Sequence, residues 1–287
     1  MRLHKKADPY LFLALPLIVY LSVVSIPIFF SVYYSFMDWN GIGDMRFIGL
    51  TNYIKMFSDA NLRICLTNTL MYSAINAVFQ VGFGMVMAIL AERLGKCSNF
   101  VRVLLFSPVI ISSMAMSQTF KKLLAISPDG VVNAVFELLG IEKIAFLSDM
   151  NVTLFVVAFV EAYKFSGLYL VIFYSAFMSI DKEVIEASVI DGASGLQRYI
   201  YIKFPMIKGL IISSIVLVVN GTLKAFEVPF ILTNGGPGYT SELLASYMYK
   251  TAFNSMDYGY GSALSILIVV VCVIMVGFIN KITAVKD

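Results

Sequence analysis

The stretch EASVIDGASGLQRYIYIKFP, residues 186–205, is a polar segment containing two glycines within a very apolar chain. Residues 181–190 have the apolar spacing of a short amphipathic helix. Gly192 is predicted to end that helix, because glycine adopts the left-handed backbone of a helix terminus at little cost. Ser194 and Gln197 fit a capping box that begins a second helix. The segment is therefore predicted to fold as helix, tight turn, helix.

The chain around this segment has the composition of an integral membrane protein. Of its 287 residues, 59% are hydrophobic and only 14% are charged, whereas a soluble domain has about 25% charged residues. The formal net charge of +3 is small for such a length, and the basic residues are scattered. A nucleic-acid-binding surface is therefore not expected.

Six apolar runs are long enough to cross a membrane as helices, since about 20 residues span the hydrocarbon layer. The runs are continuously apolar and do not alternate with period two, which favours helices over barrel strands. The first run is longer than the core of a secretory signal, so it is predicted to be retained. The fold class is thus an all-α membrane domain over residues 11–283, with spans at about 11–36, 69–91, 103–124, 152–178, 206–230 and 263–279.

The distribution of Lys and Arg predicts the orientation, because cytoplasmic segments carry more of them. With the N-terminus inside, the inner segments hold twelve basic residues and the outer segments hold seven. Both termini, including the tail of residues 1–10, are therefore expected in the cytoplasm. Residues 179–205 form a cytoplasmic loop in this topology.

The residues that usually carry metal or acid–base chemistry are scarce. The three cysteines, Cys65, Cys97 and Cys272, lie far apart in the sequence, and His4 is the single histidine. A metal site is not expected, and we expect no catalysis by this chain.

The polar segment resembles the EAA loop of permease subunits of binding-protein-dependent ABC importers. The resemblance rests on Glu186-Ala187, on Asp191-Gly192-Ala193, and on an isoleucine three residues before Pro205. Ser188 replaces the second alanine of the family pattern, and Phe204 replaces the leucine before the proline. Asn68-Thr69-Leu70, Pro108 and the run Leu232–Gly238 are similar to the carbohydrate-importing branch, which includes maltose and glycerol-phosphate permeases.

That resemblance implies a type I ABC importer permease fold in which the loop is a coupling helix that enters a groove of a cytoplasmic ATPase subunit. The coupling residues are then Glu186, Ala187, Ser188, Asp191, Gly192 and Ala193. The chain has no phosphate-binding loop of the form Gly-x-x-x-x-Gly-Lys-Ser/Thr, so ATP and Mg²⁺ are expected in separate ATPase subunits, with no cofactor in this chain. The other implied partners are a second homologous permease and an extracellular solute-binding protein. The location implied is a bacterial or archaeal inner membrane.

The resemblance also places the substrate path in the two spans that flank the loop. The approximate matches are Tyr163, Lys164, Leu168, Gly221, Thr222 and Ala225, and helix packing is the commoner explanation for each of them. Asn234, Gly235, Gly236 and Pro237 are composed as a tight turn, and the family suggests contact with the binding protein there. Charges within spans are costly, so Glu161 with Lys164, and Lys224 with Glu227, are expected either to pair along one helix face or to touch substrate.

Two alternative functions remain at this point. One is an ABC permease for peptides or amino acids, from which the Gly-Gly-Pro turn separates the carbohydrate branch. The other is a membrane-embedded enzyme that uses Glu161 or Glu227 as a general acid, although the sequence shows no second carboxylate or nucleophile to join it. The sequence does not specify which sugar is carried.

Overall fold

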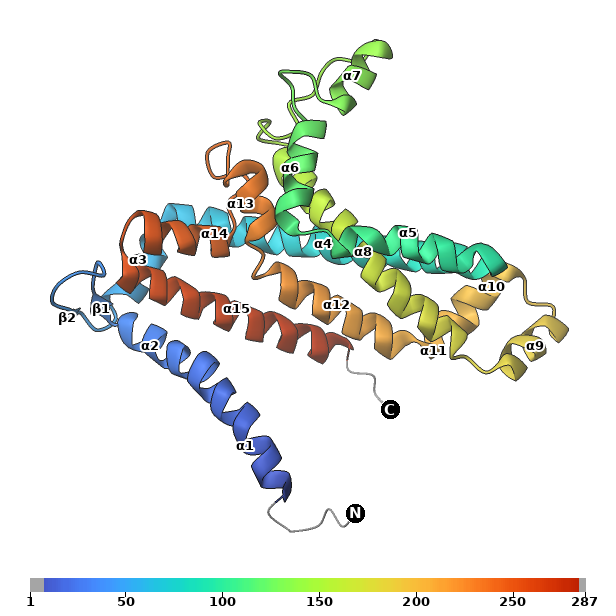
Figure 1. Cartoon of the computed structure of the whole chain (residues 1–287), viewed down its shortest axis with the longest axis horizontal. Coiled ribbons are helices and arrows are strands. Elements are labelled where there is room, and N and C mark those ends of the chain that lie inside the picture. Colours follow the sequence, from blue (N-terminus) through green and yellow to red (C-terminus); the bar gives the residue numbers. More distant parts are fainter. Residues whose placement is uncertain (1–7, 284–287) are drawn as a thin grey trace. The chain divides into compact units, whose positions relative to one another are not determined.

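The computed structural model describes residues 8–283, which are mostly helical (Figure 1). Residues 1–7 of the predicted N-terminal tail, and Lys286 among the counted basic residues, lie outside this range. The chain forms two compact units. The first contains residues up to 60 and 247–270, and the second contains residues 61–246 and those from 271 onward.

The first unit begins with a continuous helical span of three segments. Its residues are apolar, and none of η1 or α2 is buried within the chain. A two-residue antiparallel strand pair follows, in which Met37 pairs with Phe47 and Asp38 with Arg46. The elements are α1 (Asp8–Tyr20), η1 (Leu21–Ser25), α2 (Ile26–Tyr34), β1 (Met37–Asp38), β2 (Arg46–Phe47), α3 (Thr51–Ser58), η4 (Lys250–Asn254) and the start of α15 (Tyr258–Thr283).

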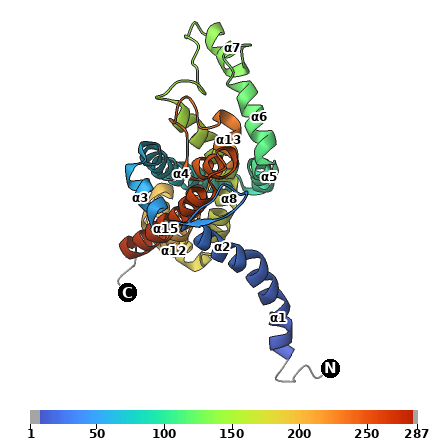
Figure 2. The same cartoon turned by 90° about the vertical axis from the view of Figure 1, so that its left-hand side faces the viewer.

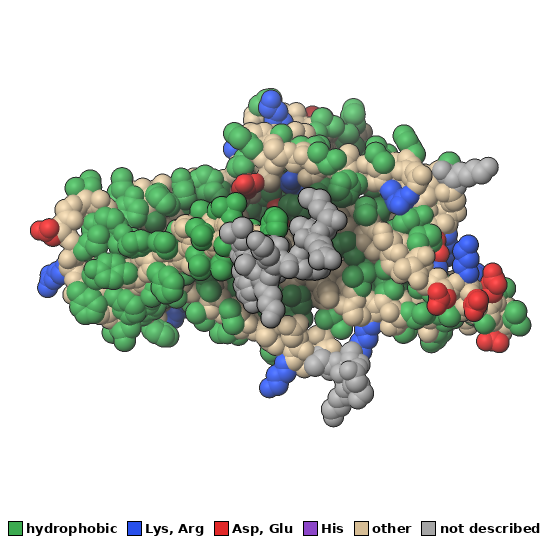
Figure 3. Space-filling model, turned by 60° about the horizontal axis from the view of Figure 1, so that its bottom comes forward, with side chains coloured by type: hydrophobic (Ala, Val, Ile, Leu, Met, Phe, Trp, Pro, Cys, Tyr) green, Lys and Arg blue, Asp and Glu red, His purple; other side chains and the backbone are tan. Residues whose placement is uncertain are grey.

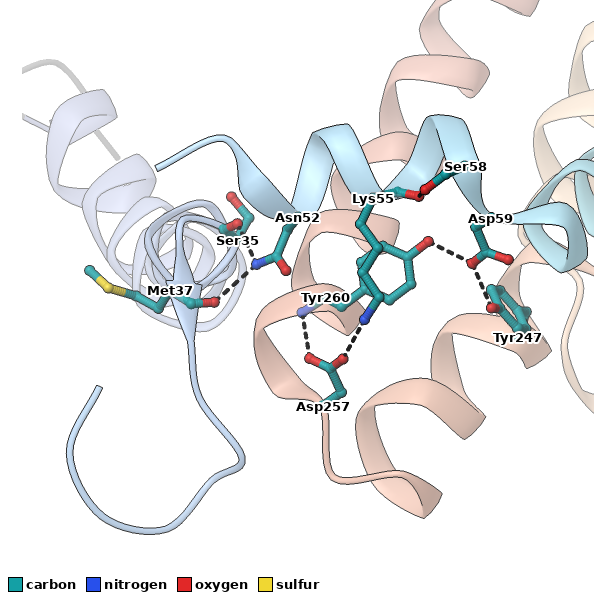
Figure 4. A network of polar contacts seen from close by, with 9 residues as sticks. All are labelled: Ser35, Met37, Asn52, Lys55, Ser58, Asp59, Tyr247, Asp257 and Tyr260. Carbon is teal, nitrogen blue, oxygen red and sulfur yellow. Dashed lines mark hydrogen bonds and ion pairs between the residues drawn. The ribbon is translucent and has the colours of Figure 1, made fainter. Parts of the chain in front are cut away.

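Asn52 and Asp59 anchor α3 and the residue after it inside this unit (Figure 4). The Asn52 side chain donates to the carbonyl oxygens of Ser35 and Met37, at 3.0 and 2.9 Å. The Asp59 carboxylate accepts hydrogen bonds from the hydroxyls of Tyr247 and Tyr260, each at 2.7 Å. These bonds join the segment after the first span to the start of α15.

The second unit contains most of the helices. Its elements are α4 (Ala60–Arg93, from its second residue), η2 (Gly95–Cys97), α5 (Ser98–Ile110), α6 (Ser113–Leu123), α7 (Val131–Leu138), α8 (Thr153–Met178), α9 (Lys182–Ile190), α10 (Gly195–Arg198), η3 (Tyr199–Lys203), α11 (Phe204–Met206), α12 (Lys208–Thr222), α13 (Glu227–Thr233) and α14 (Leu244–Tyr249, whose last three residues fall in the first unit). Within this unit, α7 lies beyond α6 and away from the other helices in both views (Figure 1, Figure 2).

Glycines let three helices of the second unit approach closely. A Cβ on Gly84 of α4 would lie 2.5 Å from the Tyr169 Cβ of α8. A Cβ on Gly167 of α8 would overlap the Leu105 carbonyl oxygen of α5. Small residues at such crossings allow helix backbones to pack in contact, as is common in membrane proteins. One core cluster joins α4, α8 and α12, and includes Val81, Phe173 and Val218.

Two predicted spans are not single helices. Within residues 8–283, four helices are long and apolar enough to cross a membrane, or up to six if two bent pairs each count as one span. The predicted span 103–124 consists of α5 and α6, bent by 96°, because Ile111 and Ser112 have extended backbones. The predicted span 206–230 is wrong in a similar way: α12 ends at Thr222 and α13 is a separate short helix.

The boundary predicted between the cytoplasmic loop and the fifth span also differs. A helical segment runs from Gly195 to Met206 and then bends by 72° at Ile207 into α12. The second helix of the predicted loop is therefore continuous with the start of the fifth span. The helical segment continues through Pro205 because this proline lies in the first positions of α11, where a missing amide hydrogen does not interrupt a helix.

Candidate functional site

α9 ends in a Schellman motif centred on Gly192. The Gly192 amide donates to the Val189 carbonyl at 3.1 Å, and the Ala193 amide donates to the Ser188 carbonyl at 3.0 Å. Gly192 has a φ of +79°, a conformation that is strained for residues with a Cβ. The positive φ and the two backbone hydrogen bonds confirm the prediction that the helix ends at Gly192.

α10 begins with the predicted capping box. The Ser194 amide donates to Gln197 Oε1 at 2.7 Å, and the Gln197 amide donates to Ser194 Oγ at 3.4 Å. Both helix ends are thus closed by hydrogen bonds inside the segment, and residues 191–193 alone lie between the end of α9 and the cap of α10. We call residues 188–197 the capped corner.

The surface of α9 is largely exposed. Its apolar side chains share that exposure: Val189 is 55% exposed and Ile190 is 86% exposed. Charged side chains of both signs gather at the end of the molecule where α9 lies (Figure 3). Of the predicted coupling residues, the structure places Glu186, Ala187, Asp191 and Gly192 at the surface, leaves Ala193 half-buried, and buries Ser188. The arrangement is an exposed helix on a corner that its own hydrogen bonds close.

The base of this segment is bound to the end of α4 through Glu92. The Tyr199 hydroxyl donates to Glu92 Oε2 at 2.8 Å, and the Lys203 ammonium forms an ion pair with Glu92 Oε1. Tyr199 and Lys203 are each only 6% exposed. The Lys203 ammonium also lies 5.5 Å from the centre of the Phe177 ring at the end of α8. A buried cluster therefore ties the helix after the capped corner to two spans.

Lys164 is buried, and its ammonium donates to the Ile111 carbonyl oxygen at 2.7 Å. Ile111 is the first residue after α5, at the 96° bend. A cation at the carbonyl end of a helix complements the negative end of the helix dipole. This contact gives Lys164 a structural role in the broken third span.

The other residues predicted for the substrate path differ in exposure. Thr222 is 3% exposed, and its hydroxyl forms a 2.8 Å hydrogen bond with the Ser73 hydroxyl of α4. A Cβ on Gly221 would meet nothing within 4 Å. Tyr163, Leu168 and Gly221 are exposed, Lys164 and Thr222 are buried, and Ala225 is half-buried.

The two expected charge pairs within spans do not form ion pairs in the part of the chain that the structure describes. Lys164 instead uses the Ile111 carbonyl. Lys224 and Glu227 are both exposed at the break after α12. For this second pair the break is the physical reason, because residues three apart face each other only when both lie in one continuous helix.

The turn after α13 is built by left-handed residues. Asn234 has a φ of +49° and Gly235 a φ of +79°. The Ser241 hydroxyl donates to the Gly236 carbonyl at 2.7 Å, which closes the turn. Asn234 is exposed, Gly236 and Pro237 are half-buried, and Gly235 is buried. A cavity of about 330 Å³ lies between this turn and residues 121–127 and 145–148.

Asn68 and Thr69 attach the segment after that turn to α4. The Asn68 side chain donates to the carbonyl oxygens of Tyr239 and Glu242, at 2.7 and 3.1 Å. The Leu244 amide donates to the Thr69 hydroxyl at 2.9 Å. The polar pair at the start of the second predicted span therefore has a structural function.

Sequence comparison assigns the chain to a family. Residues 80–284 match the family described as "Binding-protein-dependent transport system inner membrane component". The chain belongs to this family. Its members are transport components, so this permease is a transport component and not an enzyme. The interpretation as a membrane-embedded enzyme, or as a peptide or amino-acid permease, receives no support.

Individual relatives agree with this family over nearly the full length. YurN of Bacillus subtilis, a probable ABC transporter permease protein, is 33% identical over 274 residues, which cover 93% of each chain. AmyD of Thermoanaerobacterium thermosulfurigenes, a probable starch degradation products transport system permease protein, is 28% identical over 277 residues, which cover 95% of this permease and 94% of AmyD.

The fold is shared with a solved transporter. The crystal structure of a bacterial alginate ABC transporter, in complex with alginate pentasaccharide-bound periplasmic protein, contains a chain that superposes on this permease with a TM-score of 0.84. The match covers 97% of this permease and 95% of that chain, at 21% identity. The predicted all-α, type I permease fold is confirmed.

Two features of the permease were missed by the sequence reasoning. Glu92 lies at the end of the second span, next to Arg93. A carboxylate at the end of an apolar run was the signal that this side chain needs a hydrogen-bonding or charged partner. Asn133, at 0% exposure, binds the backbone of residues 125 and 144 and gave no signal beyond its amide side chain. No group of three or more His, Cys, Asp or Glu side chains within residues 8–283 is arranged to hold a metal ion.

Proposed function

We propose that this permease is the translocation subunit of an ATP-driven importer for a carbohydrate: a sugar, an oligosaccharide or a glycerol-phosphate derivative. The named functions of relatives support a carbohydrate, since AmyD is named for starch degradation products and the similar solved transporter carries alginate. The chain itself would bind no cofactor. ATP and Mg²⁺ would be bound by two separate ATPase subunits.

The capped corner is the observation that carries the coupling role. It holds an exposed helix, α9, at a fixed angle to a helical segment that continues into α12. Glu186, Ala187 and Asp191 form the docking surface, Ser188 and Ala193 close the Schellman motif, and Gly192 makes the turn. Closure of the ATPase dimer would move α9, and the corner would pass this movement to the spans.

The remaining partners follow from surfaces that the chain leaves uncovered. The span Phe12–Tyr34 has no buried residue in its most apolar window, as expected for a helix that faces lipid or a second homologous permease. The turn Asn234–Pro237 is the proposed contact with an extracellular solute-binding protein. We place the permease in a bacterial or archaeal inner membrane with both termini in the cytoplasm.

The substrate path is proposed to pass the exposed face of α8 and α12. Tyr163, Leu168 and Gly221 would line it. Lys164, Thr222 and Ala225 would position those residues from behind, because the first two are buried and Ala225 packs against the core cluster of Tyr72 and Val157.

The coupling role is tested by Gly192→Val, with Glu186→Ala as a second variant. Valine resists a positive φ by about 1–2 kcal/mol and would misdirect α10. Both variants are expected to insert and to pair with the second permease, yet to lose the ATPase subunits during purification and fail to import. The measurement is co-purification of the ATPase with tagged permease, together with substrate-stimulated ATP hydrolysis.

Gly209→Val is the matched control, because Gly209 lies in α12 without a positive φ and a Cβ there meets nothing within 4 Å. It is expected to retain the ATPase. Full retention and normal stimulation in Gly192→Val would contradict the coupling role of the capped corner.

A further inference from the structure

A cavity of about 220 Å³ lies between the end of α4, one residue of α9 and the segment from Gly195 to Lys203. It is distinct from the exposed docking surface of α9 and from the residues proposed for the substrate path. Its lining combines one apolar side chain, one glycine, one tyrosine and four charged side chains: Glu92, Arg93, Ile185, Gly195, Arg198, Tyr199 and Lys203.

The charges in this cavity do not balance. Three cations face a single carboxylate, and that carboxylate is already bound by Lys203 and Tyr199. Neither Arg93 nor Arg198 forms an ion pair among residues 8–283. Two positive charges are therefore left in excess at one small site.

The two guanidinium groups also converge. A Cβ on Gly195 would lie 3.8 Å from one terminal nitrogen of Arg93 and 3.9 Å from one terminal nitrogen of Arg198. Arg198 Nε is buried and has no hydrogen-bond partner within the described chain. A buried donor without an acceptor is costly, so its presence in a native structure indicates an acceptor supplied from elsewhere.

We propose that this cavity binds a phosphate group between the guanidinium groups of Arg93 and Arg198. Planar guanidinium groups donate paired hydrogen bonds to phosphate oxygens, and two of them match the charge of one phosphate. The bound phosphate would neutralise the excess charge and satisfy Arg198 Nε. It would also link the end of α4 to the helix after the capped corner.

Two sources can supply this group. The cavity adjoins the polar end of the apolar span α4, a depth at which basic pockets bind the headgroups of anionic phospholipids. Free phosphate in the adjoining aqueous phase offers the same chemistry. The proposal goes beyond the transport function and does not depend on which carbohydrate is carried.

The experiment measures ligand binding to the full-length permease, purified in detergent and stripped of lipid. One arm titrates phosphatidylglycerol, with phosphatidylcholine for comparison, and follows bound lipid by native mass spectrometry. The other arm titrates inorganic phosphate at constant ionic strength and follows thermal stabilisation. Arg93→Gln and Arg198→Gln are each expected to weaken the binding by about tenfold, which corresponds to the loss of one charge-assisted contact.

Lys208→Gln is the matched control, because Lys208 is an exposed cation at the start of α12, next to the segment that lines the cavity. It is expected to bind both ligands as the native chain does. Arg198→Lys keeps the positive charge but lacks the paired donors of a guanidinium group. Intermediate binding by this variant would show that the chain is folded and that the paired hydrogen bonds contribute to binding.

Binding in the lipid arm with loss in the arginine variants identifies a headgroup, and the same result in the phosphate arm identifies a soluble ligand. Equal binding by the native chain, both glutamine variants and Lys208→Gln in both arms would overturn the proposal. Loss of the ATPase subunits from the arginine variants, with phosphate and lipid binding unchanged, would also overturn it and assign the two arginines to a protein contact.

Discussion

The Lys164 ammonium lies 2.7 Å from the Ile111 carbonyl oxygen, and this bond joins α8 to the bend between α5 and α6. The bend leaves the last carbonyl groups of α5 without partners in the next turn of helix. A buried cation satisfies one of them and complements the helix dipole. The position that family resemblance placed on the substrate path thus stabilises the broken span.

Replacing Lys164 by methionine should therefore destabilise the permease. The Ile111 carbonyl would lose its charged partner, at a cost of about 1–3 kcal/mol. The apparent melting temperature in detergent is expected to fall. Lys224→Met is the control, since Lys224 is exposed. Equal melting temperatures for the two variants would show that the bend does not depend on Lys164.

Gly221→Trp is expected to abolish uptake without disturbing assembly. Gly221 is exposed, and a side chain there meets open space in this chain, so tryptophan would fill the proposed path. The buried Thr222 beside it is unsuitable for this test, because a large side chain would displace Ser73 and separate α4 from α12. Uptake and co-purification of the second permease are measured together.

Gly209→Trp provides the control at the other end of α12, where a Cβ also meets open space. It should import normally. Normal uptake by Gly221→Trp would place the carbohydrate elsewhere.

The orientation is tested with thiol reagents that do not cross membranes. The native Cys97 is exposed and follows α4 on the proposed cytoplasmic side, whereas Cys65 and Cys272 are buried. Cys97 is expected to react in permeabilised cells and not in intact cells. A cysteine at Gly236 in a Cys97→Ala background should react already in intact cells, and permeabilisation should add nothing. Reversal of both results would invert the topology.

Asn133→Ala should loosen the segment between α6 and α8. The Asn133 side chain donates to the Ala125 and Ile144 carbonyls and accepts from the Ile144 amide, all within 3.1 Å. Each buried group left unsatisfied costs about 1–3 kcal/mol. Trypsin is expected to cleave after Lys143 faster in this variant than in the native chain. Asn151→Ala, at an exposed position on the same segment, should not change the rate.

The sequence predicted the features whose causes are local. Gly192 and Ser194 specify the capped corner through backbone conformation and neighbouring hydrogen bonds, and both were identified correctly. Long apolar runs likewise identified the second and fourth spans, because length and hydropathy need no tertiary contact.

The features that the sequence did not predict depend on partners far along the chain. The bend at Ile111 is stabilised by Lys164, 53 residues later, and Glu92 is bound by Lys203, 111 residues later. Hydropathy cannot separate a bent span from a straight one, since both are equally apolar. Of the two alternatives for Lys224 and Glu227, pairing along one helix face is not observed, because the helix breaks between them.

The capped corner has a mechanical consequence. A linker positioned only by side-chain contacts with other helices would bend when α9 is displaced. A turn closed by its own backbone hydrogen bonds would keep its angle and pass the displacement on. The second joint, at Ile207, is also closed locally, since its amide donates to the Lys203 carbonyl at 3.1 Å and its carbonyl accepts from the Leu210 amide at 2.9 Å. We therefore expect the segment from α9 to α12 to move as one rigid lever with two fixed bends. Displacement of α9 would then change the tilt of α12, which carries Gly221 near its C-terminal end.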